Sequence, residues 1–167
     1  MDNNLEDNCH QYDLEAWWSD GLNFTCIPEC GRCCNEPDGL VFLSTKDAES
    51  LSQHFGMQVN EWIDRDCTRY RDGRIILKSR DSDGICIYLS ENMSCNVYDE
   101  KPTQCSAFPW WKENIRNERS WEKTKRICPG IDSEGAEKIR PAIISKWVNK
   151  DIESTKGFRR YTKSKNE

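Results

Sequence analysis

The sequence has few aliphatic residues and no long apolar run. Hydrophobic residues make up 36% of the 167 positions and charged residues 32%, and this hydrophobic share is low for a globular domain. A membrane-spanning helix needs about 18 or more consecutive apolar residues, and no such run is present. The first residues, MDNNLEDNCHQYD, are acidic and polar, without the apolar stretch of a secretory signal. We therefore expect no membrane contact and a cytoplasmic location.

The chain also lacks an excess of basic residues. It contains 24 Lys and Arg against 29 Asp and Glu, which gives a net charge of -5 and a pI of about 5.2. Because a nucleic-acid-binding domain usually carries a basic face, we expect no nucleic-acid partner. The motifs G-x-S-x-G and H-E-x-x-H and the Walker loop are absent too, so hydrolase and transferase activities have little support. The sequence leaves open whether the protein is an enzyme.

Aromatic residues partly offset the low aliphatic content. The chain contains 7 Trp, 5 Tyr and 5 Phe, and each of these side chains buries a large area. The length is that of one domain, which we expect over residues 1–153, followed by a polar, basic and flexible tail at 154–167. With so few aliphatic residues, bound metal is expected to supply part of the folding free energy.

Cysteine is present in excess, with 10 residues. Four of them lie within one short segment, Cys26-Ile-Pro-Glu-Cys30-Gly-Arg-Cys33-Cys34. Clustering gains nothing in packing, because a thiol is only a small hydrophobic group. Clustered thiolates do bind soft metal ions and iron–sulfur clusters. The segment therefore predicts a metalloprotein.

Eight cysteines form the predicted set of metal ligands. Eight thiols make two sets of four, and four is the ligand number of a structural zinc site or an iron–sulfur cluster. Neighbouring side chains usually diverge, so we expect the last two cysteines of the segment to bind different centres, or only one of them to bind. Cys9 and Cys67 lie outside the pattern and are not expected to be ligands. The eight predicted ligands are Cys26, Cys30, Cys33, Cys34, Cys86, Cys95, Cys105 and Cys128.

Histidine is scarce. Only two are present, His10 and His54, and neither lies at a ligand spacing from the cysteines. Structural zinc sites often recruit histidine, so the all-sulfur set favours one or more iron–sulfur clusters as the cofactor, with zinc as the alternative. Aromatic residues near the late cysteines would exclude water from a cluster and tune its potential. The predicted function is electron transfer or iron handling, with an unidentified redox or client protein as the partner.

Three alternatives compete with this interpretation. The even number of cysteines suits a disulfide scaffold, but adjacent cysteines and the missing export signal argue against one. A zinc-stabilised interaction module without chemistry would use the same thiols. A radical S-adenosylmethionine enzyme shares the spacing Cys26-x3-Cys30-x2-Cys33, but such enzymes usually carry an aromatic residue where this chain has Arg32.

The elements expected from residue patterns are short. Ser44 or Thr45 is expected to cap a helix that begins there, and two strands within 85–98 are expected to form a hairpin that holds Cys86 and Cys95 opposite each other. Further helices are expected at 13–22, 61–70, 102–105, 120–127 and 134–153, the last with a start or a kink at Pro141, and strands are expected at 40–43 and 73–79. The predicted fold class is α+β: a small single domain of short helices around a small antiparallel hairpin, organised on a cysteine-bound metal centre.

The cysteines and their neighbours resemble the YkgJ-type cysteine-cluster proteins, the zinc- or iron-chelating CxxCxxCC family. The resemblance covers about residues 14–132 and implies metal or iron–sulfur binding. It departs at Lys101 and Ser106, where relatives usually carry arginine, and flagellin lysine-N-methylases are similar in the same cluster. The matching segments are FTCIPECGRCC at 24–34, VFLS at 41–44 with Asp47, GICIYL at 84–89, CNVY at 95–98, KPTQC at 101–105, FP at 108–109 and CPGI at 128–131.

Overall fold

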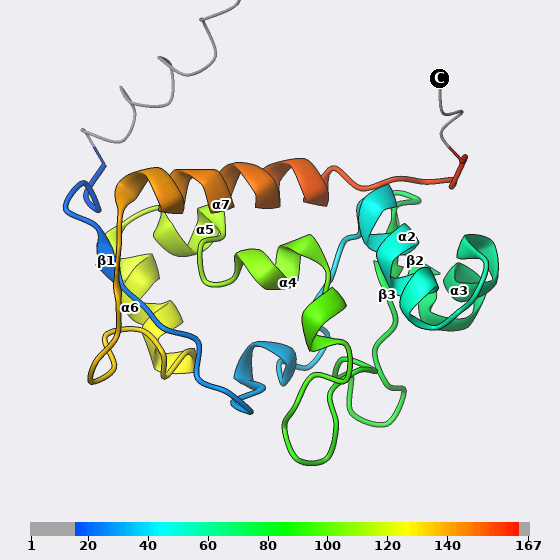
Figure 1. The fold of residues 1–167 in the computed structure, drawn as a ribbon, viewed down its shortest axis with the longest axis horizontal. Helices are drawn as coiled ribbons and strands as arrows, with labels where there is room; N and C mark the ends of the chain where they lie inside the picture. The colour runs from blue at the N-terminus through cyan, green and yellow to red at the C-terminus, as the bar shows by residue number, and fades with distance from the viewer. Residues whose placement is uncertain (1–15, 164–167) are drawn as a thin grey trace, which may run out of the picture. The chain divides into compact units, whose positions relative to one another are not determined.

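The computed structural model describes residues 16–163, and its helices and strands are short (Figure 1). Two small antiparallel sheets accompany the helices, so the predicted α+β class is confirmed. No helix within the described residues is long and apolar enough to cross a membrane. The described chain divides into two compact units: unit 1 consists of residues 16–28 and 107–152, and unit 2 of residues 29–106 and 153–163.

Unit 1 is built from a pair of strands and three helices. β1 (Leu22–Asn23) pairs antiparallel with β4 (Lys138–Ile139). Asn117 caps α6, because its side-chain oxygen accepts a hydrogen bond from the Ser120 N–H. The helix expected at 134–153 begins only at Pro141, whose missing N–H is tolerated in a first helical turn. The helices are α5 (Lys112–Ile115), α6 (Glu118–Ile127) and α7 (Pro141–Thr155), the last residues of which belong to unit 2.

Aromatic residues form much of the core of unit 1. The rings of Trp110 and Trp121 stack with their centroids 5.3 Å apart. Trp17 packs on Trp121 and Phe24 packs on Trp110, with ring centroids 6.4 and 5.6 Å apart. Cys128 is buried in the same cluster. The large area of these rings replaces the aliphatic side chains that the sequence lacks.

Unit 2 carries most of the cysteines on short elements. Ser44 caps α2 as predicted, and with Asp47 it forms a capping box, in which each side chain accepts a hydrogen bond from the other residue's N–H. The second carboxylate oxygen of Asp47 accepts hydrogen bonds from the N–H and hydroxyl of Thr103 at 2.8 and 2.7 Å, which ties α2 to α4. The elements are η1 (Arg32–Cys34), α2 (Thr45–His54), α3 (Val59–Asp66), β2 (Cys67–Arg69), β3 (Ile75–Leu77), η2 (Tyr98–Glu100) and α4 (Thr103–Ala107), whose last residue belongs to unit 1.

The core of unit 2 packs α2 and α3 against the hairpin formed by β2 and β3. Trp62 is among its fully buried side chains. The segment after α7 also contributes, because the Ile75 N–H donates to the Phe158 carbonyl oxygen at 2.9 Å and the Phe158 ring packs on this core. Where a strand was expected at 40–43, a single bridge joins Phe42 to β3.

The first expected helix is replaced by turns. Residues 16–20 form turns, and β1 follows directly, so the prediction of a helix at 13–22 is wrong for this part. Gly21 has a φ of 84°, and a Cβ on it would lie 2.5 Å from the carbonyl oxygen of Ile139. The chain therefore turns tightly into the strand pair, as only glycine permits.

The helix expected at 61–70 is α3, which ends before Cys67. Cys67 starts β2 instead, because its pairing with Leu77 outweighs the local helix propensity. α3 also begins earlier than predicted, where the Glu61 carboxylate accepts a hydrogen bond from the Gln58 N–H at 3.2 Å.

The hairpin expected at 85–98 is irregular. Single bridges join Ser79 to Cys86 and Leu89 to Cys95 in place of the two paired strands. Apolar residues alternate in this segment because some of them pack on the core of unit 2, and not because the segment forms a regular β-ladder. Side chains must therefore fix the shape of the loop that carries these two thiols.

Candidate metal centre

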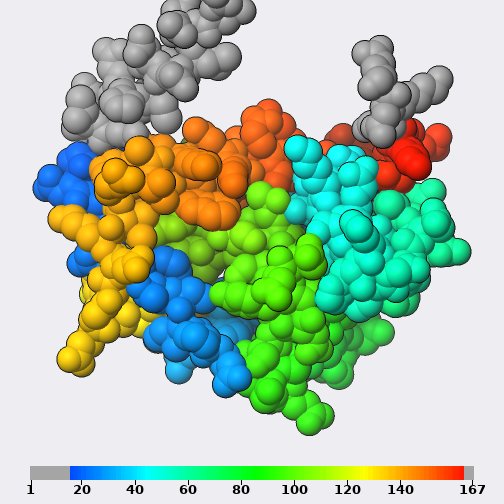
Figure 2. Space-filling view, in the orientation of Figure 1, coloured from blue at the N-terminus to red at the C-terminus, as the bar shows by residue number. Residues whose placement is uncertain are grey.

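Two adjacent thiols lie near the start of unit 2. η1 turns the chain so that the Sγ atoms of Cys33 and Cys34 are 4.0 Å apart. Gly31 precedes η1 with a φ of 58°, and a Cβ on it would lie 2.2 Å from the carbonyl oxygen of Met93. Only glycine permits this approach, so the cysteine run lies directly against the loop that carries Cys95. The two segments, light blue and green in Figures 1 and 2, are in contact.

Cys86 and Cys95 lie on one irregular loop of unit 2. Tyr88 lies between them, and its carbonyl oxygen accepts a hydrogen bond from the Asn96 N–H at 2.8 Å. The Leu89 N–H returns to the Cys86 carbonyl oxygen at 3.1 Å. These bonds fold the loop back on itself, and its two thiols interact electrostatically.

A buried hydrogen-bond network anchors this loop to α3. The Tyr88 hydroxyl accepts a hydrogen bond from Trp62 Nε1 at 3.0 Å and donates one to the carboxylate of Asp66. The Arg65 guanidinium donates to both oxygens of Asp66 at 2.8 and 2.6 Å. Burial alone would raise the pKa of Asp66, but the hydrogen bonds from Arg65 and Tyr88 lower it below its usual value. Asp66 is therefore an ionised acceptor that holds Tyr88 in place.

Cys105 is held from a third segment, on α4. Its neighbour Gln104 is buried and uses both ends of its amide. The side-chain oxygen accepts a hydrogen bond from the Phe42 N–H at 2.8 Å, and the side-chain nitrogen donates to the Leu40 carbonyl oxygen at 2.9 Å. Together with the bonds between Thr103 and α2, this fixes the position of the Cys105 thiol within unit 2.

Five thiols of unit 2 lie close enough to shift one another's ionisation. Four of them form a complete set, in which every thiol interacts electrostatically with the other three: Cys33, Cys86, Cys95 and Cys105. Cys34 interacts with Cys33, Cys95 and Cys105. The fold thus gathers five of the eight predicted ligands, from positions far apart in the sequence.

Two of the five thiols have lowered pKa values. A hydrogen bond with Cys34 lowers the pKa of Cys33 to about 7, and the charge of Lys101 adds to this effect. The hydrogen bond with Cys34 also lowers the pKa of Cys95 to about 6, assisted by the Val97 N–H and by Lys101. The Lys101 ammonium is held 3.9 Å from the centre of the Tyr98 ring. Both thiols are therefore present in substantial part as thiolates near neutral pH, and the thiolate is the form that binds metal.

The other three thiols have raised pKa values. Its hydrogen bonds to Cys33 and Cys95 raise the pKa of Cys34 far above the ordinary thiol value. Burial is the largest cause of the raised pKa values of Cys86 and Cys105, and the nearby thiols add to it. Buried thiols that lie this close together repel one another when they ionise. Binding of a cation therefore stabilises their thiolate forms.

The structure does not group the other three predicted ligands with these five thiols. Cys30 belongs to unit 2 and is half-buried. Cys26 and Cys128 belong to unit 1, where the Thr25 N–H donates to the Gly130 carbonyl oxygen at 3.1 Å. This backbone pairing brings the two cysteines to neighbouring positions of unit 1. Their role as ligands, like that of Cys30, stays a prediction.

The two cysteines that were set aside differ in what the structure says of them. Cys9 lies outside the described residues. Cys67 is buried in the core of unit 2 on β2, where it packs with apolar side chains. Burial raises the pKa of Cys67 to about 12. Such a thiol behaves as a small hydrophobic residue.

Sequence reasoning missed the residues that support the thiols. Tyr88 and Gln104 lie within the matching segments GICIYL and KPTQC, but nothing in the sequence indicates that their side chains are hydrogen-bonded in the interior. Lys101 was noted only as a departure from an expected arginine, although a cation among clustered cysteines is itself a signal for lowered thiol pKa values. Residue type alone does not show which cation faces which thiol.

The donor set fits a soft metal or an iron–sulfur cluster, because the gathered side chains are all thiols. His54 packs on the Phe55 ring with centroids 4.9 Å apart and is not among the residues that shift these thiols. Within residues 16–163, no three cysteine, histidine or acidic side chains stand at the spacing of a formed metal site. Four of the five thiols match the ligand number of either candidate centre.

The comparison with known proteins agrees with this donor set. The profile of the CxxCxxCC family, described as a "Putative zinc- or iron-chelating domain", matches residues 25–129. The matched segment contains all five gathered thiols and covers more than half of the chain. No solved structure matches the chain at a significant level. The protein therefore belongs to the CxxCxxCC family, and metal chelation, of zinc or iron, is its function at the level that the family defines.

Proposed function

We propose that unit 2 binds an iron–sulfur cluster through Cys33, Cys86, Cys95 and Cys105. The observation that carries this proposal is the complete set of electrostatic interactions among these four thiols. Cys34 is left out of the set because its hydrogen bonds to Cys33 and Cys95 raise its pKa, so that it keeps its proton. Four thiolates are the usual ligands of such a cluster.

The surroundings of the four thiols favour iron–sulfur over zinc. Structural zinc sites often include an imidazole, whereas the groups that shift the pKa values of these four thiols are other thiols, backbone N–H groups and the ammonium group of Lys101. A positive charge beside a cluster stabilises its more negative, reduced form. A bound cluster would supply one-electron transfer, and Lys101 would raise its reduction potential.

The biochemical role that follows is electron transfer to or from a partner protein, or the handling of iron, in the cytoplasm. Reduced thiols persist in that compartment. The radical-enzyme alternative gains no support, because the sheets of the described chain are two-stranded and antiparallel. We propose a redox or client protein as the partner.

Anaerobic purification tests this proposal. The holoprotein is expected to be brown, to absorb at about 400 nm as iron–sulfur proteins commonly do, and to contain iron and acid-labile sulfide. Cys86→Ser and Cys105→Ser should each abolish the absorption, whereas Cys67→Ala should retain it. A colourless protein that holds zinc and no sulfide would contradict the proposal in favour of the zinc-stabilised module.

A further inference from the structure

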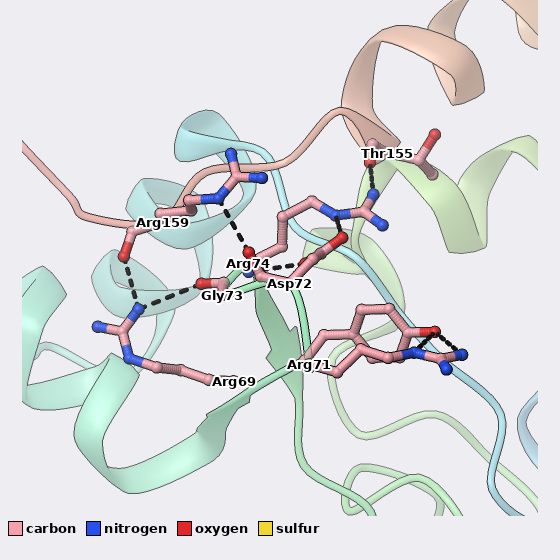
Figure 3. Close-up of polar contacts among 8 residues, drawn as sticks. Arg69, Arg71, Asp72, Gly73, Arg74, Thr155 and Arg159 are labelled. Carbon is pink, nitrogen blue, oxygen red and sulfur yellow. Dashed lines mark hydrogen bonds and ion pairs between the residues drawn. The ribbon is translucent and has the colours of Figure 1, made fainter.

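Four arginines gather at the turn between β2 and β3 and on the segment after α7 (Figure 3). Arg69 Nη1 donates to the carbonyl oxygens of Gly73 and Arg159 at 3.2 and 2.7 Å. Arg159 Nε donates to the Asp72 carbonyl oxygen at 3.0 Å. Arg74 Nη1 donates to a carbonyl oxygen at the end of α7 at 2.6 Å. Together with Arg71, these residues form what we call the arginine face of unit 2.

Backbone carbonyls hold several of these guanidinium groups without neutralising them. Among residues 16–163, only Arg74 of the four has a carboxylate within ion-pair distance, with Arg74 Nε 2.8 Å from an oxygen of Asp72. Arg71 bonds to the uncharged hydroxyl of Tyr70 at 2.8 and 2.6 Å. The side chains of Arg69, Arg71 and Arg159 are exposed. Their remaining N–H donors are therefore available in fixed positions, at a reduced entropic cost for a ligand that pairs with them.

The positive charge of the arginine face is opposite in sign to that of the chain as a whole, which carries -5. Among the described residues, Asp72 is the carboxylate that forms an ion pair with one of these four guanidinium groups, that of Arg74. We propose that the arginine face is a docking surface for a carboxylate-rich segment of a partner protein. Planar guanidinium groups bind carboxylates in pairs of parallel hydrogen bonds. The proposal goes beyond metal binding and does not depend on which metal the protein holds.

A protein partner suits this surface better than a nucleic acid does. Proteins that bind single strands offer exposed aromatic rings on which bases stack. The aromatic ring of the arginine face, Tyr70, is already covered: Arg71 and Arg74 lie 5.0 and 5.8 Å from its centre, and the Phe42 ring meets it edge-on at 5.3 Å. The net negative charge of the chain also disfavours a long polyanion.

Binding of a labelled oligoglutamate peptide to the metal-loaded full chain tests the proposal. Fluorescence anisotropy at low ionic strength is expected to show saturable binding that weakens as salt is added. The double variant Arg71→Gln/Arg159→Gln should weaken binding about five- to tenfold, as for the loss of two exposed charge pairs. The matched control, Lys123→Gln/Arg126→Gln, removes the same charge from the exposed side of α6 and should change binding less than about twofold.

Two further measurements keep the outcome clear. Metal content and circular dichroism of the arginine variant should equal those of the wild type, because neither residue contacts the thiols; failure of the iron–sulfur proposal would leave the peptide result unchanged. The proposal is overturned if both double variants weaken binding equally, or if no saturable binding occurs. Tighter, arginine-dependent binding of a single-stranded oligonucleotide would also overturn it, in favour of a nucleic-acid partner.

Discussion

At the scale of single residues, the thiols of unit 2 differ in ionisation because their neighbours differ. Cys33 and Cys95 share a hydrogen-bond donor in Cys34 and a cation in Lys101, and both have lowered pKa values. Burial is the largest influence on Cys67, the Asp66 carboxylate adds to it and Lys78 opposes it, and the pKa of Cys67 is raised to about 12. Identical side chains are thus divided into reactive and inert groups by their surroundings.

We expect Cys33 and Cys95 to be alkylated first in reduced, metal-free protein. Their pKa values of about 7 and about 6 leave thiolate present near neutral pH, whereas the ordinary value is 9.0. A thiolate is protonated as the pH falls through its own pKa. Alkylation should therefore slow as the pH falls through about 7 for Cys33 and through about 6 for Cys95. Mass spectrometry after brief iodoacetamide treatment over a pH series measures this, with Cys67 as the slow control. An inflection near pH 9 for Cys33 would contradict the expectation.

Lys101→Met is expected to raise the pKa of Cys33 and Cys95, since it removes a positive charge that favours both thiolates. Alkylation at pH 6–7 should slow by about two- to tenfold, the effect of a shift of up to one pKa unit. Lys46→Met removes an exposed charge on α2 and serves as the control. Equal alkylation rates in the Lys101→Met and Lys46→Met variants would show that the hydrogen bond with Cys34, and not the charge of Lys101, lowers the pKa values of Cys33 and Cys95.

Gly31→Ala and Gly56→Ala form a second pair of residue-scale tests. Both glycines have a positive φ, 58° and 64°, so alanine costs about 1–2 kcal/mol of conformational energy at each. At Gly56 nothing lies within 4 Å of the added Cβ, whereas at Gly31 it would lie 2.2 Å from the Met93 carbonyl oxygen. We expect Gly31→Ala to lose most of its bound metal and Gly56→Ala to keep it, as measured by elemental analysis. Full metal content in Gly31→Ala would show that the cysteine run tolerates displacement from the loop.

At the scale of elements, the start of α2 was predicted correctly, whereas α3 and α6 begin before the predicted residues. The pattern Ser44-x-x-Asp47 marks the start of α2 because both capping bonds lie within four residues. The loop at 85–98 could not be predicted in the same way. Its shape depends on Tyr88 reaching Trp62 and Asp66, which are more than twenty positions away. An alternating pattern cannot distinguish such long-range anchoring from strand pairing.

The residue types of the site were predicted, but which cysteines lie together was predicted only in part. Clustered cysteines without histidine indicate a sulfur-bound centre whatever the fold. Spacing does not say that Cys33, Cys86, Cys95 and Cys105 lie in unit 2 while Cys128 lies in unit 1. That division depends on contacts such as those of Gln104 with residues 40 and 42, which join segments about sixty positions apart.

Tyr88→Phe tests whether the anchored loop positions its thiols. The variant keeps the ring but leaves the buried Trp62 N–H without its acceptor and removes one donor from Asp66, at a cost of about 1–3 kcal/mol. We expect a lower unfolding temperature and also faster metal release to a chelator, because Cys86 and Cys95 lose a fixed separation. Tyr161→Phe, which removes an exposed hydroxyl bonded to Glu49, should change neither by much. Lower stability with unchanged release kinetics would limit Tyr88 to a purely structural role.

At the scale of the whole molecule, metal is expected to contribute a large part of the free energy of unfolding. Structural metal sites contribute on the order of 10 kcal/mol, and whole domains are stable by ~5–15 kcal/mol. The thiols of unit 2 come from three segments, and buried thiols repel one another as they ionise. Removing the metal should therefore cost unit 2 much of its stability.

Chelation under reducing conditions, followed by thermal unfolding, measures this contribution. A loss of ~5 kcal/mol would lower the unfolding temperature by roughly 10–20 °C for a chain of this length. Trp62 is the tryptophan of unit 2, so a variant that keeps it and replaces the other tryptophans with Phe would report unit 2 by fluorescence. A sharp transition at nearly the original temperature after confirmed metal loss would show that the core of unit 2 is sufficient for its stability.

The discontinuous path of unit 2 has a consequence for the timing of its synthesis. Cys33 and Cys105 are 72 positions apart, so a ribosome that adds about 5–20 residues per second exposes the cysteine run for roughly 4–14 s before the last of the four thiols is made. Phe158, which covers β3, is added later still, after the whole of residues 107–152. The nascent chain therefore carries reactive thiols on a core that is unfinished until residue 158 has been added.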